Sequence, residues 1–278
     1  MQNQNIVITG GTDGIGKAAA IQLAKLGASL VLVSRNPSKG TTAVAEIKQA
    51  SGNDAITFLQ ADLSIVKNVK HAATQIREIF DRVDVLVHCA GNLFPQRRTL
   101  TEDGLELSFA IQYMARYVLT NELLDLLRAA PAPQVLSVAG GGTVTGKIDF
   151  DNLQGEKHYG LMEVMKISGR ACDLLTLEQI ERYPEITFYN YGPGIVRSGP
   201  IVKNPAMRLF INTVGRLFSN SKEQAANDMA ELLTGQYASG LYGTSANCND
   251  SPECADTVSR KRMWEYGETV VTDVLATA

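Results

Sequence analysis

The chain is poor in the residues that mark secreted, metal-binding and nucleic-acid-binding proteins. Its 278 residues include only 4 cysteines and 3 histidines, and 29 acidic side chains outnumber 26 basic ones. A net charge of −3 attracts no polyanion, so we expect no nucleic-acid partner. We expect reduced thiols and no metal site, because no partner spacing supports a clip or a metal pair at the last two of the four cysteines. These are Cys89, Cys172, Cys248 and Cys254.

Long apolar runs are also missing. No run approaches the roughly 18 residues of a membrane span, and Met1 to Asn5 lead straight into a strand pattern without a basic and apolar leader. We therefore expect a cytoplasmic protein with no membrane span. Apolar residues still make up 45% of the chain, enough for one large core, so a single domain is expected over residues 1–278.

Short β-branched runs alternate with longer helical patterns, which is the order of βαβ units. Runs such as Ser29–Val33 are apolar on both faces, as in a parallel sheet covered by helices on both sides. The predicted strands are Asn5–Thr9, Ser29–Val33, Ala55–Gln60, Asp84–His88, Gln134–Val138, Ile186–Asn190 and Gly240–Gly243. The predicted helices are Ile15–Leu26, Lys39–Ser51, Ile65–Phe80, Thr101–Arg128, Met162–Arg182, Lys222–Thr234 and Thr257–Val271. The fold class is α/β.

One stretch, residues 198–221, fits neither pattern. It is irregular, and its apolar residues are scattered. A substrate lid and a plain surface excursion both explain such a segment.

A glycine-rich turn lies between the first strand pattern and the first helix pattern, over Thr9–Gly16. Gly10 permits the tight turn, Gly14 lets the backbone approach a pyrophosphate, and Gly16 permits close helix packing. The helix that opens there directs free N–H groups and a positive dipole end at phosphates. The turn therefore predicts a dinucleotide site, and its other residues are Thr12, Asp13 and Ile15.

The second strand ends in Ser34-Arg35-Asn36, without the acidic residue that accepts a hydrogen bond from a free ribose 2′-hydroxyl. Arg35, helped by Lys39, would instead pair with a 2′-phosphate. The alternative is a solvated surface arginine. We favour NADP(H) over NAD(H) as the cofactor.

Together these segments resemble the short-chain dehydrogenase/reductase family, and most nearly its retinol-dehydrogenase-like branch. The general motifs are Thr9–Gly16, Ala61–Ser64, Cys89–Gly91 and Pro193–Gly194. The branch motifs are Asp103–Phe109, Gly146–Ile148, Asn152–Lys157 and Arg262–Glu265.

The resemblance implies a Rossmann-type, doubly wound sheet of seven parallel strands that binds a small-molecule substrate. It implies that Asp62 and Leu63 lie at the adenine, and that Cys89, Ala90 and Gly91 lie under the cofactor. The residues implied around the nicotinamide are Pro193, Gly194, Ile195 and Ser198. It further implies a homodimer or homotetramer paired through the long helices, and a C-terminal segment with Trp264 that closes one side of the pocket.

The catalytic residues that the resemblance implies are largely replaced. The family uses a tyrosine as proton donor, a lysine four residues later that holds the ribose, a serine that steadies the oxygen, and an asparagine. Here Lys166 is present, but Met162 stands at the tyrosine position, Gly140 at the serine position and Gln112 at the asparagine position. A thioether has no proton to donate. Met162 and Gly140 would instead shape an apolar pocket.

Other proton donors are open, because the stretch between Lys157 and Lys166 is about three residues shorter than in the family. Tyr159 lies seven residues before Lys166 and can share its helix face; His158 and Glu163 are weaker alternatives. Glu163 is better explained as the ion-pair partner of Lys166. Tyr113 and Tyr117 are expected to serve packing.

Three functions are consistent with this site. The first is an NADPH-dependent reductase of a bulky apolar molecule in secondary metabolism, whose substrate needs no proton from the enzyme, such as an iminium ion or an activated double bond. The second is a redox-neutral cyclase or isomerase, and the third is a non-catalytic NADP-binding protein.

Overall fold

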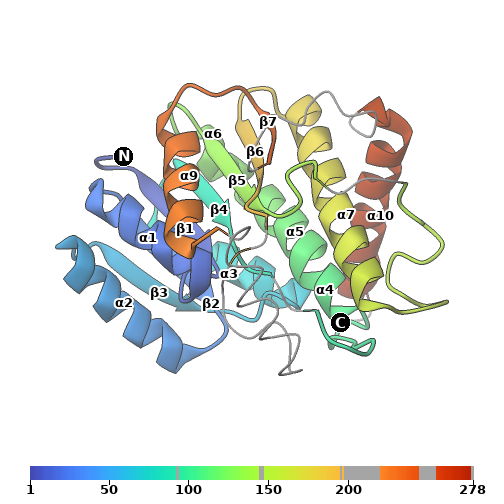
Figure 1. Ribbon diagram of the computed structural model, residues 1–278. Coiled ribbons are helices and arrows are strands. Elements are labelled where there is room, and N and C mark those ends of the chain that lie inside the picture. Colours follow the sequence, from blue (N-terminus) through green and yellow to red (C-terminus); the bar gives the residue numbers. More distant parts are fainter. Residues whose placement is uncertain (92–93, 144–146, 195, 197–219, 244–254, 277–278) are drawn as a thin grey trace.

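Seven parallel strands form the centre of the molecule in the computed structural model, in the order β3-β2-β1-β4-β5-β6-β7 (Figure 1). The structure describes residues 1–91, 94–143, 147–194, 196, 220–243 and 255–276. The strands are β1 Asn5–Thr9, β2 Ser29–Ser34, β3 Ile56–Gln60, β4 Val85–His88, β5 Gln134–Val138, β6 Thr187–Gly192 and β7 Gly240–Gly243. The predicted α/β fold with seven parallel strands is confirmed.

Helices cover both faces of this sheet (Figure 1). One face carries α1 Gly14–Lys25, α2 Pro37–Ser51 and α9 Lys222–Thr234. The other carries α3 Val66–Ile79, the run α4 Leu107–Phe109, η1 Ala110–Met114, α5 Ala115–Glu122 and α6 Leu124–Arg128, then α7 Leu161–Arg182 and α10 Thr257–Ala276. Among the described residues, no helix has the length and apolarity that crossing a membrane requires.

The strand order reverses at β1, which pairs with β2 on one side and β4 on the other. Thr9 at the end of β1 lies level with Val33 of β2 and His88 of β4. In open α/β sheets a ligand binds outside the carboxyl ends of the strands at such a reversal. The fold therefore places the glycine-rich turn, which follows Thr9, at the expected crevice.

The single helix expected over Thr101–Arg128 is wrong at its start and in its interior. Helix formation begins only at Leu107, because the Glu106 carboxylate accepts a hydrogen bond from Phe109 N at 2.8 Å and caps the first turn. The residues before it form a turn closed by a bridge between Leu100 and Glu106. Ala110–Met114 then forms a π-helical turn, a distortion often found at functional sites.

The C-terminal helix covers other helices instead of closing a pocket, so that expectation for Trp264 is wrong. The Trp264 ring is buried, 4.8 Å from the Tyr117 ring centroid and 4.3 Å from the Arg182 guanidinium carbon. Tyr113 donates a hydrogen bond to Met263 O at 2.6 Å. The prediction that Tyr113 and Tyr117 serve packing is confirmed, because both are buried beneath α10.

Trp264→Ala should lower the free energy of unfolding by about 3 kcal/mol, because it removes a fully packed ring and leaves a cavity. Denaturant unfolding would measure this loss, and Trp264→Phe, which keeps an aromatic ring, should lose less. NADPH affinity, followed by cofactor fluorescence, should stay unchanged in both variants. A Trp264 variant with normal stability but without NADPH affinity would contradict this prediction and would place Trp264 in the wall of the pocket.

Candidate active site

The glycine-rich turn touches the end of β4 at the point where the strand order reverses. Gly10 has φ +69°, and a Cβ added there would lie 2.7 Å from Ala90 N. A Cβ on Gly16 would lie 2.4 Å from Gly10 O. Both contacts are too short for any side chain, so only glycine lets α1 begin this close to the sheet. Gly14 opens α1, also at a positive φ of +53°.

Asp13 and Thr12 hold the same turn through their side chains. Asp13 Oδ1 accepts a hydrogen bond from Gly14 N at 2.8 Å, and Oδ2 pairs with Lys39 Nζ at 3.0 Å. The Lys39 hydrogen bond, followed by that of Gly14 N, lowers the pKa of Asp13. Thr12 Oγ1 donates to Ser34 Oγ at 3.1 Å and ties the turn to β2. Lys39 is therefore engaged by Asp13 and does not support Arg35 as expected.

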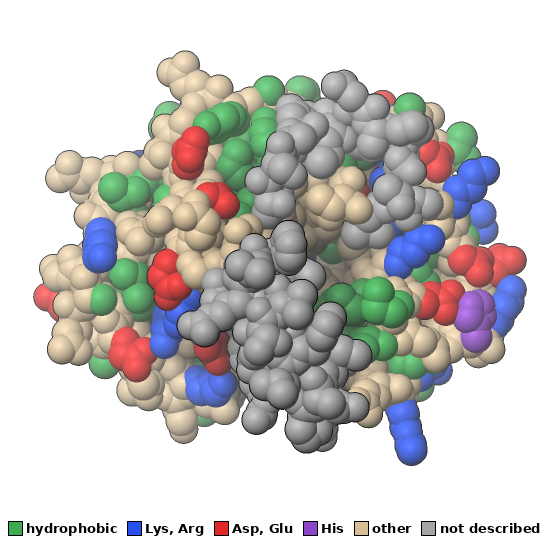
Figure 2. Space-filling view, in the orientation of Figure 1, with side chains coloured by type: hydrophobic (Ala, Val, Ile, Leu, Met, Phe, Trp, Pro, Cys, Tyr) green, Lys and Arg blue, Asp and Glu red, His purple; other side chains and the backbone are tan. Residues whose placement is uncertain are grey.

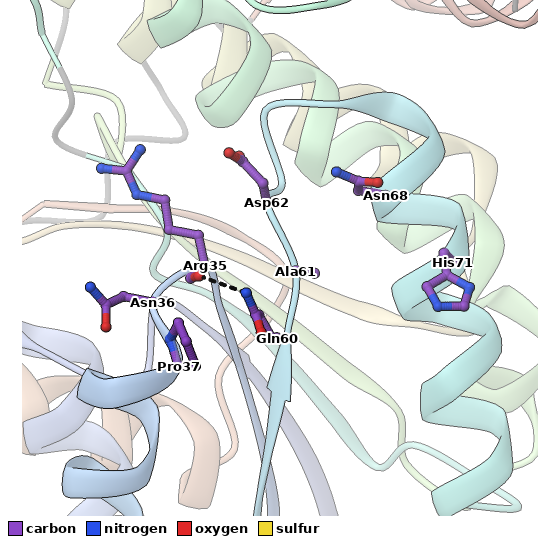
Figure 3. A pocket seen from close by; sticks show the side chains of 8 residues that line it. All are labelled: Arg35, Asn36, Pro37, Gln60, Ala61, Asp62, Asn68 and His71. Carbon is purple, nitrogen blue, oxygen red and sulfur yellow. Dashed lines mark hydrogen bonds between the residues drawn. The ribbon is translucent and has the colours of Figure 1, made fainter.

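A cavity of about 540 Å³ opens beside the ends of β2 and β3 (Figure 3). Arg35 and Asp62 both line it, as the sequence predicts for the adenosine end of the cofactor. Asp62 Oδ1 accepts from Ser64 N at 3.0 Å and from Ser64 Oγ at 2.7 Å, which fixes the turn that Leu63 continues. Sequence reasoning missed four other polar lining residues: Asn36, Gln60, Asn68 and His71. The signal available in the sequence was the spacing of Asn68 and His71, which lie three residues apart at the start of α3.

At the other end of the crevice, Cys89, Ala90 and Gly91 follow β4 and meet the π-helical turn. A Cβ on Gly91 would lie 3.2 Å from Gln112 Oε1. Gln112 is buried, and its carbonyl accepts a hydrogen bond from Cys172 Sγ of α7 at 3.0 Å. The structure thus brings Gln112 beside Gly91.

The loop after β5 is closed by hydrogen bonds to its own backbone and fits tightly against β6. Gly140 O accepts hydrogen bonds from Thr143 N at 3.0 Å and Thr143 Oγ1 at 2.6 Å. A Cβ on Gly192 would lie 2.4 Å from Gly140 O, so the loop fits tightly against β6. Gly142 N donates to Asp173 Oδ1 of α7 at 3.1 Å. This loop offers no hydroxyl at Gly140 itself.

The structure does not bring Met162 and Lys166 to Gly140. Met162 is 75% exposed in the first turn of α7, and Lys166 is also exposed. Cys172, which contacts Gln112, lies six residues beyond Lys166, or about 9 Å along the helix axis. Side chains of a helix lean toward its N-terminus, so the Lys166 ammonium extends away from Gln112.

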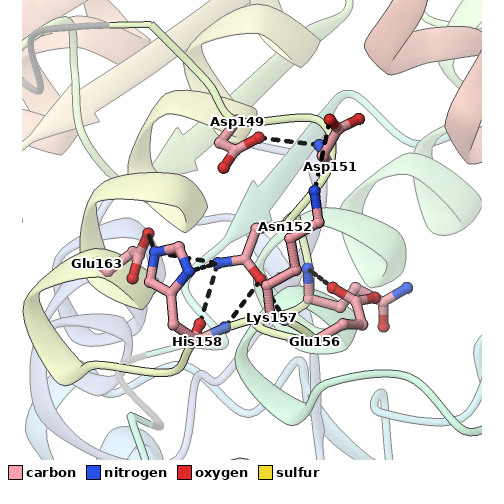
Figure 4. A network of polar contacts seen from close by, with 8 residues as sticks. Asp149, Asp151, Asn152, Glu156, Lys157, His158 and Glu163 are labelled. Carbon is pink, nitrogen blue, oxygen red and sulfur yellow. Dashed lines mark hydrogen bonds and ion pairs between the residues drawn. The ribbon is translucent and has the colours of Figure 1, made fainter.

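Of the alternative donors, Tyr159 and His158 lie in the loop before α7 and Glu163 lies in its first turn; Figure 4 shows His158 and Glu163. Tyr159 Oη donates to Pro95 O at 3.0 Å and lies 3.3 Å from Glu106 Oε1. Burial, and then the Glu106 charge, raise the pKa of Tyr159 to about 12. The Tyr159 hydroxyl is therefore engaged by Pro95 and Glu106 within the protein.

The ion pair expected between Glu163 and Lys166 is wrong. Glu163 Oε1 instead lies 2.7 Å from His158 Nε2 (Figure 4). Asn152 Nδ2 donates to His158 O at 3.0 Å, which folds this loop back so that the imidazole reaches the first turn of α7.

Some predicted residues lie outside the described part of the chain: Ile195, Ser198, most of the 198–221 segment, Cys248 and Cys254. Pro193 O accepts a hydrogen bond from Asn220 Nδ2 at 3.1 Å, and Gly194 has φ +66°. Cys89 and Cys172 are free thiols. Within the described ranges, no group of three or more His, Cys, Asp or Glu side chains is arranged to hold a metal.

Residues 4–150 match the family model for short chain dehydrogenases. The chain belongs to the short-chain dehydrogenase/reductase family. Its relatives there include bovine retinol dehydrogenase 12, 30% identical over 93% of this chain and 83% of that one. A Streptomyces sp. (strain C5) protein named as a daunorubicin C-13 ketoreductase is 28% identical, over 98% of this chain and 94% of its own. These relatives support the assignment of this chain to the retinol-dehydrogenase-like branch and to the oxidoreductases.

Solved structures of the family share the fold. An uncharacterised protein from Mycobacterium paratuberculosis superposes with a TM-score of 0.76 at 20% identity, over 98% of this chain and 94% of that chain. A short chain dehydrogenase from Escherichia coli CFT073, complexed with NADPH, gives 0.69 at 19% identity, over 88% and 98%. The crevice at the strand reversal, with glycines where a Cβ would clash, fits a dinucleotide of this kind.

Asp173→Asn should change how stability depends on pH. Burial raises the pKa of Asp173 from 3.8 to about 7, so its neutral form stabilises the fold at low pH. That contribution is lost as the pH rises from about 4 to 7, by at most about 1.4 kcal/mol per unit. Asparagine keeps the acceptor for Gly142 N and cannot ionise, so the variant should gain on the wild type over this range. Unfolding at pH 5, 6, 7 and 8 tests this; a constant difference would contradict it.

Proposed function

We propose that this protein binds NADP(H) in the crevice and reduces a bulky apolar molecule without a phenolic proton donor. The observation that carries the proposal is the contrast between the two ends of the site. The nucleotide end combines the glycine turn with Arg35 in a cavity. The end at α7 offers thioethers and glycine where the family places its acid.

Arg35 supports NADP(H) over NAD(H). It lines the cavity at the end of β2, and the neighbouring residues, Ser34 and Asn36, carry no charge. A guanidinium pairs well with a phosphate, whereas a ribose hydroxyl would need an acceptor there. Asp62 lies across the same cavity, on the side that the resemblance assigns to adenine.

The tyrosine and lysine positions are proposed to lie one turn further along α7 than the sequence suggests, at Met165 and Gly169. Gly169 is three residues from Cys172, about 4.5 Å along the axis, and therefore lies nearer to Gln112 than Lys166 does. It is buried, whereas Lys166 is exposed. With Gln112 and Gly140, this register replaces all four family side chains.

Such a site is limited in its chemistry. NADPH, when bound, supplies a hydride. A substrate that is already cationic, such as an iminium ion, needs no proton when it accepts the hydride, and an activated double bond can take its proton from water. The residues of the chain then contribute position and an apolar surface. Ordinary ketone reduction should be slower by roughly 10² to 10⁴ without a positioned acid.

The exposed first turns of α7 support the proposal of an apolar substrate. Leu161, Met162 and Met165 are exposed there, at 41%, 75% and 39%. Figure 2 shows hydrophobic side chains gathered over these first turns. Retinol, which occurs in the name of one relative, is itself largely apolar. A role in secondary metabolism and a cytoplasmic location remain part of the proposal.

A redox-neutral cyclase or isomerase is the second candidate, because a site without its acid can still orient an apolar substrate. A homo-oligomer also remains a proposal. Trp264 of α10 packs against Tyr117 of α5, so this face of α5 is already covered within one chain.

Arg35→Ala should weaken NADPH binding by about tenfold or more and leave NADH binding unchanged, because only NADPH carries the 2′-phosphate. Cofactor fluorescence titration measures both dissociation constants. Lys39→Ala is the matched control: its ion pair with Asp13 is exposed, and we expect little change. Equal losses for both cofactors, or a wild type that prefers NADH, would contradict the proposed cofactor.

Restoring the family side chains at Gly140→Ser, Met165→Tyr and Gly169→Lys should raise NADPH-dependent ketone reduction by about tenfold or more. Gly140→Ser with Met162→Tyr should not, and Tyr159→Phe should leave the rate unchanged. Absorbance of NADPH and chromatography of the product give the stoichiometry. A gain from Met162→Tyr would restore the register at Lys166, and product formed without NADPH oxidation would favour the second candidate.

A further inference from the structure

Arg116 of α5 is a buried arginine whose bonding is half complete. Its Nη2 donates to Val138 O at 2.9 Å and to Ala90 O at 3.4 Å. Nη2 therefore joins the end of β5 to the residues that follow β4. Nε and Nη1 are also buried, but neither has a hydrogen-bond partner among the described residues. Two nitrogen atoms of a buried guanidinium without hydrogen-bond partners are costly unless a ligand or water completes them.

The charge of Arg116 is also unbalanced. In the described part of the chain no carboxylate forms an ion pair with it, and two titratable side chains on which its charge acts, His88 and Cys89, do not balance that charge. Burial, and then the Arg116 charge, hold the pKa of His88 well below its usual value. Burial raises the pKa of Cys89 to about 12, although the Arg116 charge acts in the opposite direction. Buried charges in proteins are normally paired, so this one calls for an anionic partner.

The position of Arg116 indicates which partner. A Cβ on Gly91 would lie 3.7 Å from Arg116 Nη2. The guanidinium therefore lies beside Gly91, at the end of the crevice that the resemblance assigns to the nicotinamide. Its charge also acts on Cys172 of α7, about one turn from Gly169, which supplies no ammonium group.

We propose that Arg116 is the cation of this site, and that Nε and Nη1 bind oxygen atoms of the nicotinamide-ribose half of NADP(H). An arginine from α5 would thus replace a cation that the family takes from α7. Arg116 would position the cofactor and take no part in bond breaking. This inference rests on the proposed binding of NADP(H).

The test compares two ligands that share only the adenosine end. NADPH contains both halves, whereas adenosine 2′,5′-bisphosphate lacks the nicotinamide ribose. Arg116→Met should weaken NADPH binding by roughly tenfold or more, the effect of losing charge-assisted hydrogen bonds. It should leave adenosine 2′,5′-bisphosphate binding unchanged. Arg116→Lys, which keeps the charge but not the planar fork, should fall between Arg116→Met and the wild type.

Arg260→Met is the matched control. Arg260 is also largely buried with an unpartnered Nε, but it pairs with Glu181 at the C-terminal end of α7. It should lose stability without losing NADPH affinity. Fluorescence titration and calorimetry give the affinities. For a variant that folds poorly, thermal unfolding with and without NADPH shows whether NADPH still stabilises the folded protein.

Arg116→Met that binds NADPH within twofold of the wild type, or that loses both ligands equally, would overturn the inference. A wild type that binds adenosine 2′,5′-bisphosphate and NADPH equally well would also overturn it. A wild type that binds neither ligand would instead refute the proposed function.

Discussion

The approach of the glycine turn to the end of β4 is the contact on which the site depends. Gly10 lies so close to Ala90 that one added carbon would overlap the backbone. This approach lets α1 start at the strand reversal, with its free N–H groups at the mouth of the crevice. The cavity at Arg35 and the floor at Gly91 lie on either side of this contact, so both ends of the site take their positions from it.

The face of the sheet that carries α5 and α7 determines the chemistry. The π-helical turn at Gln112 and the thiol of Cys172 hold these two helices together at the level of the strand ends. That contact defines which residues of α7 can reach the cofactor. Two buried polar groups lie at this level: Arg116 is beside Gly91, and Asp173 accepts a hydrogen bond from Gly142 N.

Local patterns predicted the parts of the site that adjoin strand ends. The strands were found within a few residues, since apolar runs bounded by glycine and polar residues are specific signals. Arg35 and Asp62 follow strands directly, so both were placed at the cavity. The helix predicted over Thr101–Arg128 begins only at Leu107, because the cap at Glu106 resembles an ordinary interior residue in the sequence.

The sequence by itself determined the α/β class and the glycine-rich turn between β1 and α1, because each depends on residue type at short spacing. Only the tertiary structure decided the partner of Glu163, the packing of Trp264 under α10, and the exposure of Met162 and Lys166. It also revealed Arg116, which has no local signature. These properties depend on where two helices meet. A helical face repeats with every turn, so residue spacing alone cannot distinguish one turn of α7 from the next.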